Sequence, residues 1–203
     1  MIQVTREITM NIAKFQLGDI ISFTLNTGEQ IKAKAVKETK DGMIFVTIDC
    51  LKTEDQMYKS PCTNINYLNS LLRKTLNGEI LESFPADIRR RMAGMQISNT
   101  DFFDMLRIPT EHEIFGKNYY GKDENASVDR FYGMENRHNR MAFKGSETGD
   151  WECYWLQNRA EEETYNHLFG CADEDGDANF DNAFFCHGVR LVFLLAQNNN
   201  EVL

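Results

Sequence analysis

Polar and apolar positions alternate along the first fifty residues and predict a small antiparallel β unit. Three stretches there are rich in β-branched and aromatic residues, the composition that strands favour. Residues 26–29 and the pair Asp41 and Gly42 lie between these stretches and have the composition of tight turns. The three predicted strands are residues 20–25, 30–36 and 43–49.

A helical period replaces this alternation after residue 66. Apolar residues then recur every three or four positions, which places them on one face of a helix over about residues 66–83. Pro85 suits the first turn of a second helix, predicted over residues 85–92. The apolar positions of the first helix are Leu68, Leu71, Leu72, Leu76, Ile80 and Leu81.

A stretch in the middle of the chain carries the clearest local signal. Thr110 and Glu113 have the spacing of a capping box, in which the hydroxyl and the carboxylate each accept a free backbone N–H. Gly116 suits the left-handed residue that follows a helix. A short helix is therefore expected between Thr110 and Gly116. Arg190, far along the chain, is expected to form a structural ion pair with Glu111 or Glu113.

Strands are expected again in the second half of the chain. Residues 140–143 and 151–156 have the composition of strands, and residues 188–195 have that of a buried strand. The aromatic residues expected in the core are Trp151, Tyr154 and Trp155.

Residues 165–187 are the most informative part of the chain. Asp, Asn and aromatic residues crowd this stretch, which shows almost no regular hydrophobic period. Loops longer than about 12–15 residues are uncommon unless they are functional or disordered, and the aromatic residues argue against disorder. Aromatic side chains beside Asn and Asp are also typical of antibody binding loops. The sequence thus predicts an exposed binding surface here.

The residues expected to contact a ligand are Tyr165, Asn166, His167, Phe169, Cys171, Asp173, Asp175, Asp177, Phe180, Asp181, Asn182, Phe184, Phe185, Cys186 and His187. The aromatic members would provide large contact areas, and the polar members would provide adaptable hydrogen bonds. The alternative is that Phe180, Phe184 and Phe185 pack the core beneath a loop.

Composition narrows the class of protein. The 203 residues, 42% of them hydrophobic, suffice for a domain with a small appendage. A net charge of −9 argues against a nucleic-acid partner, because phosphate binding needs clustered Lys and Arg. No apolar run approaches the roughly 20 residues of a membrane helix, and residues 1–10 lack the apolar core of a secretory signal. We expect a cytoplasmic or virion-associated protein without membrane insertion.

Three segments are expected along the chain: an extension (residues 1–14), a β unit (15–60) and a larger domain (61–203). The alternative is that the last two form one continuous domain. No metal or other cofactor is expected, although Asp173, Asp175 and Asp177 suggest a calcium loop as an alternative, since alternating carboxylates can wrap a hard cation. The EF-hand spacing is not matched, because Ala178 and Phe184 stand where Gly and Glu are needed. A solvated acidic loop is the simpler interpretation.

Residues 107–113 (RIPTEHE) and 188–193 (GVRLVF) are two motifs with a common resemblance. They resemble segments of formylglycine-generating-enzyme-like proteins, which have a C-type-lectin-like fold. A closer resemblance is to bacterial and phage domains of unassigned function, which share further motifs seen here at residues 72–77, 84–92 and 151–156. The resemblance covers nearly the whole chain from about Phe15. It implies an α+β fold, in which residues 61–203 form a C-type-lectin-like domain preceded by a small N-terminal antiparallel β unit.

The chain is also similar to variable proteins of diversity-generating retroelements. In such folds the segment before the terminal G-x-R strand lies on an exposed ligand-binding face, which those proteins mutate at adenines in Asn-type codons. Between Thr164 and His187, only Glu174 lies outside the residue types that this process yields. The resemblance implies a phage or mobile-element origin and a non-enzymatic module that binds a protein or carbohydrate ligand.

Enzymes are the alternative class. Formylglycine-generating enzymes hold copper with a closely placed cysteine pair near the C-terminus, whereas Cys171 and Cys186 are fifteen residues apart. A cysteine nucleophile paired with His167 or His187 would suit a hydrolase, but no hydrolase signature accompanies it. The five cysteines are odd in number and include no CxxC, so reduced thiols are expected. A calcium-dependent lectin is a third hypothesis.

Overall fold

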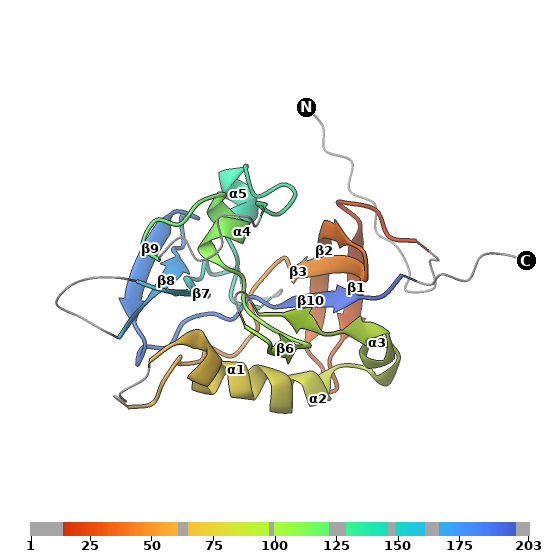
Figure 1. The fold of residues 1–203 in the computed structure, drawn as a ribbon, viewed down its shortest axis with the longest axis horizontal. Coiled ribbons are helices and arrows are strands. Elements are labelled where there is room, and N and C mark those ends of the chain that lie inside the picture. Colours follow the sequence, from red (N-terminus) through yellow and green to blue (C-terminus); the bar gives the residue numbers. More distant parts are fainter. Residues whose placement is uncertain are drawn as a thin grey trace, which may run out of the picture.

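The computed structural model describes residues 14–60, 65–97, 100–121, 129–145, 149–160 and 167–197. They form an α+β protein whose sheets are built from antiparallel strand pairs (Figure 1), so the fold class predicted from the sequence is confirmed. The strands are β1 (Ile20–Thr24), β2 (Gln30–Thr39), β3 (Gly42–Thr47), β4 (Met92–Ala93), β5 (Met95–Gln96), β6 (Phe103–Asp104), β7 (Tyr154–Arg159), β8 (Leu168–Ala172), β9 (Ala178–Asn182) and β10 (Val192–Leu195). The helices are η1 (Tyr67–Asn69), α1 (Leu71–Thr75), η2 (Leu76–Ile80), α2 (Leu81–Ser83), α3 (Ala86–Arg91), α4 (Glu111–Phe115) and α5 (Arg137–Arg140).

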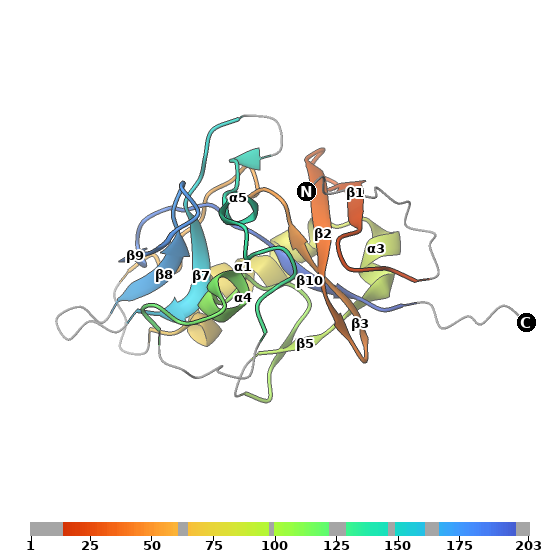
Figure 2. The ribbon, with the colours of Figure 1, turned by 90° about the horizontal axis from the view of Figure 1, so that it is seen from above.

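The larger sheet joins segments from distant parts of the chain. Its strand order is β1-β2-β3-β10-β4, so β10 lies between β3 and β4 (Figures 1 and 2). The register pairs Phe193 with Phe45 and Leu195 with Met43. The expected boundary at residue 60 therefore divides one sheet, in which β10 pairs directly with the N-terminal β unit.

Among the N-terminal strands, β2 shows alternating burial and β3 is buried throughout. β2 buries every second side chain over its first half, and all three predicted strands are confirmed. Gly28 and Gly42 lie in the two turns, with φ of +88° and +153°. A Cβ at Gly42 would lie 2.2 Å from the backbone oxygen of Leu195, so a side chain there would push β10 away from β3.

Phe193 of β10 lies at the centre of the main core. Its ring stacks on Phe45 at 5.8 Å between centroids and meets Phe23 and Phe84 edge-on at 6.1 and 5.7 Å. Offset and edge-to-face rings of this kind add about 0.5–1.5 kcal/mol per pair to the burial of their area. The core thus connects β1, β3, β10 and the end of the helical run.

An almost continuous helical run, from η1 to α2, covers one side of the molecule, along the lower edge of Figure 1. The Ser70 hydroxyl caps α1 by accepting the Arg73 N–H at 3.0 Å, and Leu72 and Leu76 are completely buried. η2 is a π-helical turn, where the Asn77 side chain binds the backbone of residues 105 and 106. The predicted helix over residues 66–83 is confirmed in extent, and α3 confirms the second helix.

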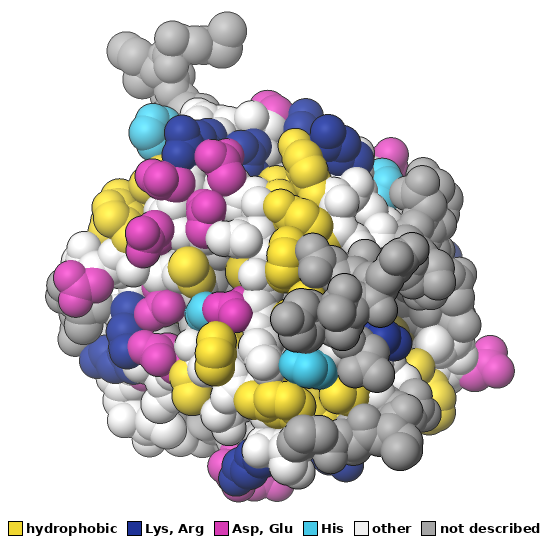
Figure 3. Space-filling view, turned by 90° about the vertical axis from the view of Figure 1, so that its left-hand side faces the viewer, with side chains coloured by type: hydrophobic (Ala, Val, Ile, Leu, Met, Phe, Trp, Pro, Cys, Tyr) yellow, Lys and Arg dark blue, Asp and Glu magenta, His cyan; other side chains and the backbone are white. Residues whose placement is uncertain are grey.

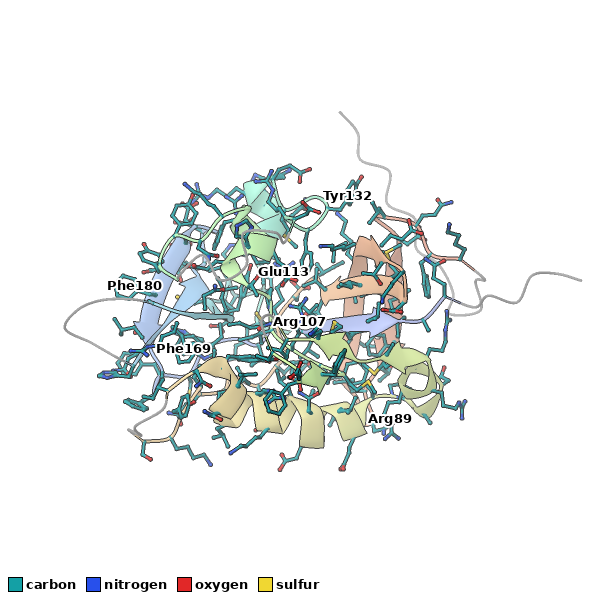
Figure 4. All side chains as sticks on the ribbon, viewed as in Figure 1. Arg89, Arg107, Glu113, Tyr132, Phe169 and Phe180 are labelled. Carbon is teal, nitrogen blue, oxygen red and sulfur yellow. The ribbon has the colours of Figure 1, made fainter. Side chains whose placement is uncertain are left out.

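The predicted capping box at the start of α4 is also confirmed. The Thr110 hydroxyl accepts the Glu113 N–H at 3.2 Å, and the Glu113 carboxylate accepts the Thr110 N–H at 3.0 Å. Gly116 ends the helix with φ of +77°. Arg107 binds the same carboxylate with two N–H groups, and both side chains are buried near the middle of the molecule (Figure 4).

The ion pair expected for Arg190 is wrong. Glu113 pairs with Arg107, and the Glu111 carboxylate accepts backbone N–H groups of residues 119–121. Arg190 instead donates to backbone oxygens of Thr47, Asn139 and Arg140. The sequence predicted an acidic partner for Arg190, whereas in the structure its guanidinium binds backbone carbonyl oxygens.

The smaller sheet, in the order β7-β8-β9, lies at the opposite end of the molecule from β1 and β2 (Figure 1). Tyr154 and Trp155 of β7 are completely buried, as predicted. Trp151 is 47% exposed and stacks on Phe143 at 3.9 Å, so its expected core position is wrong. The strand predicted at residues 140–143 is also wrong, since α5 ends at Arg140 and Phe143 forms only an isolated bridge.

Candidate functional site

Residues 168–182 form a regular hairpin, followed by a short loop, where the sequence predicted one long loop. β8 pairs with β9 in continuous register, from Leu168 opposite Asn182 to Ala172 opposite Ala178. The tight turn of residues 173–177 joins them, with Gly176 at φ of +77°. Tyr165 and Asn166, the first two predicted contact residues, lie outside the described residues.

Phe169 and Cys171 lie in the core, so their prediction as contact residues is wrong. Phe169 is 0% and Cys171 3% exposed, because β8 is the middle strand of the sheet and all five of its residues are buried. Phe169 packs against Tyr58 at 6.4 Å between ring centroids. Figure 4 shows the contrast with Phe180, which lies on the outer strand β9.

The other described candidates line β9, the turn before it and the loop after it. We call the accessible side chains of residues 173–187 the β9 surface. Phe185, near the end of this segment, is 55% exposed. Acidic and hydrophobic side chains lie side by side on this end of the molecule (Figure 3). The exposed candidates are Asp175, Asp177, Phe185 and Cys186, and the half-buried ones are Asp173, Phe180, Asp181, Asn182, Phe184 and His187.

Two backbone N–H groups of β9 are hydrogen-bonded to side chains of the same strand. The N–H of Phe180 donates to Asn179 Oδ1 at 2.9 Å, and the N–H of Asn182 donates to Asp181 Oδ1 at 2.6 Å. An exposed strand edge commonly invites another strand through its unpaired N–H groups. These two donors are already occupied, so the geometry favours recognition by side chains over strand addition.

The three carboxylates considered for calcium are engaged within the protein. Asp173 Oδ1 accepts the N–H groups of Asp175 and Asp177 at 3.1 and 2.8 Å, which fixes the turn. Asp175 and Asp177 each lie 3.3 Å from the guanidinium of Arg137 on α5. Across the described ranges, no three His, Cys, Asp or Glu side chains are grouped as metal ligands.

His187 joins the loop after β9 to the smaller sheet. Its Nε2 lies 2.9 Å from Asp181 Oδ2, and its ring meets Trp155 edge-on at 4.4 Å. Its backbone pairs with that of Asp55, whose oxygen also accepts the indole N–H of Trp155 at 2.9 Å. Burial raises the pKa of the Asp55 carboxyl above its ordinary value. The loop is thereby held on a rigid base.

His167 and Phe184 give the surface its second aromatic contact. Their rings stack at 5.4 Å, and the Gln56 side chain donates to the backbone oxygen of Phe184. Phe184 therefore packs partly against the core, which confirms in part the alternative that some of these rings are structural. Phe180 packs edge-on against Tyr120 at 4.9 Å and keeps one side accessible.

The two cysteines considered for copper or for nucleophilic chemistry have different environments. Cys171 is buried, and burial raises the pKa of its thiol, which opposes formation of the reactive thiolate. Cys186 is exposed, and both thiols are free. His187 Nε2 contacts Asp181, and His167 stacks on Phe184. Within the described residues, neither of these two thiols is hydrogen-bonded to His167 or His187.

Three features near this surface were missed by sequence reasoning. They are the exposed Trp151–Phe143 stack, the Tyr120–Phe180 contact and the position of Asp55 beneath the loop. Each joins residues that are distant in sequence or lie in irregular segments, so periodicity could not reveal them. The hairpin itself had a signal, because the five residues of β8, LFGCA, are a short apolar run.

The fold and this surface define an α+β protein that presents acidic and aromatic side chains on an outer strand. Comparison of the chain with protein-family models, with curated proteins and with solved structures gave no match. Within the described part of the chain, no helix has both the length and the apolar character needed to cross a membrane.

Proposed function

We propose that this protein is a non-enzymatic binding module of C-type-lectin-like architecture that contacts a protein partner through the β9 surface. The observation that carries the proposal is the exposure of Phe185 beside the Asp181–His187 pair, on a loop anchored to Trp155 and Asp55. An exposed aromatic ring on a rigid base offers contact area at a low cost in conformational entropy.

The charge of the surface indicates the chemistry of the partner. Its acidic residues outnumber the basic ones, and Arg137 and Arg140 of α5 form ion pairs with the acidic residues of the turn. The favoured partner therefore offers Lys or Arg groups around an apolar centre, since complementary charge steers association and sets specificity. A carbohydrate ligand is the alternative that the experiment distinguishes.

A phage or mobile-element origin, with diversification of this surface, belongs to the same proposal. Accessible side chains on β9 can change without loss of the core, because the neighbouring strands β8 and β7 of the same sheet carry the buried residues. The neighbouring DNA tests this part. A reverse transcriptase gene beside a near-copy of the 3′ coding end would support diversification, and the lack of both would remove it.

Binding can be tested with two probes, a displayed library of random peptides and an array of immobilised glycans. Peptides selected against the wild type should lose binding to Phe185→Ser and Asp181→Asn. Phe103→Ser is the matched control, because Phe103 is a 64% exposed phenylalanine on β6 and outside the β9 surface. Equal loss in the control, or binding of glycans alone, would contradict the proposal.

A further inference from the structure

A cavity of about 180 Å³ lies away from the β9 surface, between the larger sheet and the segment of residues 132–141. Two cationic side chains line it, Lys34 from β2 and Arg190 from the stretch just before β10. Tyr132, at its edge, is labelled in Figure 4 between α5 and β2. None of residues 173–187, which form the β9 surface, lines this cavity.

Arg190 is a buried cation without a carboxylate partner. It is 3% exposed, and within the described ranges no acid lies at ion-pair distance from it. Its Nε donates to Thr47 O at 2.7 Å, Nη2 to Asn139 O at 3.1 Å, and Nη1 to two oxygens at 3.2 and 3.3 Å. A guanidinium has five N–H donors, so these four bonds leave one Nη2 hydrogen for a ligand.

Lys34 brings a second positive charge to the same cavity. It is half-buried, and its Nζ lies 5.7 Å from the centroid of the Tyr132 ring. Burial lowers the pKa of this amine; Glu135 opposes the shift and Arg190 adds to it. Two cations on one cavity disfavour each other, and carbonyl dipoles offset a buried charge only in part. An anion between them would remove that cost.

The rest of the lining has a polar part, formed by Tyr132, His138 and Asn139, and an apolar part. A bare inorganic ion would leave this part of the wall without a partner, whereas an organic acid would cover it. The volume equals that of roughly six waters at about 30 Å³ each, which is below the range of about 300–1,000 Å³ for drug-sized ligands. The apolar lining residues are Ile20, Val46, Ile48, Met134 and Met141.

We propose that this cavity binds a small organic anion, with its carboxylate between Lys34 and Arg190 and an apolar body against the sheet. The remaining Nη2 hydrogen of Arg190 and the Lys34 ammonium would each donate to the carboxylate, in charge-assisted hydrogen bonds. Binding would need both parts of the ligand, because the carboxylate would contact the two cations and the small apolar body would contact the apolar lining.

Isothermal titration calorimetry with benzoate, benzamide and inorganic phosphate tests the site. Benzamide has nearly the shape of benzoate without its charge, and phosphate has charge without an apolar body. Benzoate should bind saturably, and benzamide and phosphate should each bind at least about tenfold more weakly, which corresponds to about 1.4 kcal/mol. Lys34→Gln should weaken benzoate by a similar factor.

Lys37→Gln is the matched control, since Lys37 lies on the same strand and does not line the cavity. It should leave benzoate affinity unchanged. Lack of saturable benzoate binding to the wild type would overturn the proposal. So would phosphate binding as tight as that of benzoate, which would show a site for charge alone, or equal weakening by both Lys substitutions, which would show a general effect of net charge.

Discussion

Arg107 and Glu113 form a buried, two-pronged ion pair, with Nη1 2.7 Å from Oε2 and Nη2 2.5 Å from Oε1. The same carboxylate completes the capping box by accepting the Thr110 N–H. One side chain therefore satisfies both a buried cation and the first turn of α4. Loss of the carboxylate would leave the guanidinium without a counter-charge and the Thr110 N–H without its acceptor.

We predict that Glu113→Gln lowers the free energy of unfolding by about 3–5 kcal/mol, because the Arg107 charge would stay buried without a counter-charge. Urea denaturation measures the change. Glu82→Gln, at an exposed position in α2, should remain within about 0.5 kcal/mol of the wild type. A similar small effect for Glu113→Gln would contradict the assigned role of this pair.

Gly42→Ala should cost more than about 3 kcal/mol, because it combines a left-handed backbone with a clash against the Leu195 oxygen. Gly28→Ala is the control, since Gly28 is also left-handed but a Cβ there meets nothing within 4 Å. That substitution should cost only about 1–2 kcal/mol. Thermal and urea unfolding would show the difference, and equal losses would mean that β10 can shift freely.

Substitution of Phe169, on β8, and of Phe185, in the loop after β9, should have different effects on the free energy of unfolding. Phe169→Ser should lower the free energy of unfolding by at least about 3–5 kcal/mol, because it opens a cavity in the core and buries a hydroxyl. Phe185→Ser should change it by less than about 0.5 kcal/mol. A large loss of stability for Phe185→Ser would place its ring in the core and remove it from the binding surface.

Asp55 should contribute to the dependence of stability on pH. Because its pKa is raised in the folded protein, its contribution is present below about pH 3.8 and is lost as pH rises through the folded pKa. Asp55→Asn should therefore gain stability relative to the wild type as pH rises from 3.8 upward. Urea titrations at a series of pH values measure this difference. Asp87→Asn, on the exposed face of α3, controls for the loss of one carboxylate.

The cysteines should differ in their rate of reaction with a thiol reagent. Cys186 is exposed, whereas Cys50 and Cys171 are buried, and burial raises the pKa of both buried thiols. We expect rapid modification of Cys186 and slow modification of the other two until the protein unfolds. Mass spectrometry of the peptides identifies the modified sites. Rapid labelling of Cys171 in the folded protein would contradict its position in the core.

Local signals predicted the fold where the determining contacts are local. The Thr110–Glu113 capping box, the three N-terminal strands and the helical run follow from patterns within a few turns of the chain. The partners of Arg190 come from positions near 47 and 140, and no local pattern indicates them. The placement of β10 between β3 and β4 has the same long-range origin.

The site was predicted in outline and missed in detail. The composition of residues 165–187 indicated an unusual surface, and β9 with the following loop does present much of it. Composition does not show to which side of a strand each side chain points. Phe169 and Cys171 were therefore predicted on the same surface as Phe180. Only the pairing of β8 with β9, and its central position beside β7, shows which side chains point inward.

The position of β10 between β3 and β4 has a consequence for biosynthesis. A ribosome completes β1, β2 and β3 well before it reaches Val192, so the growing chain exposes the open side of β3 for most of its synthesis. Pairing between strands that are distant in sequence slows folding, and an unpaired strand edge can aggregate with other chains before the pairing forms. Nascent molecules of this protein should depend on chaperones until their last strand emerges.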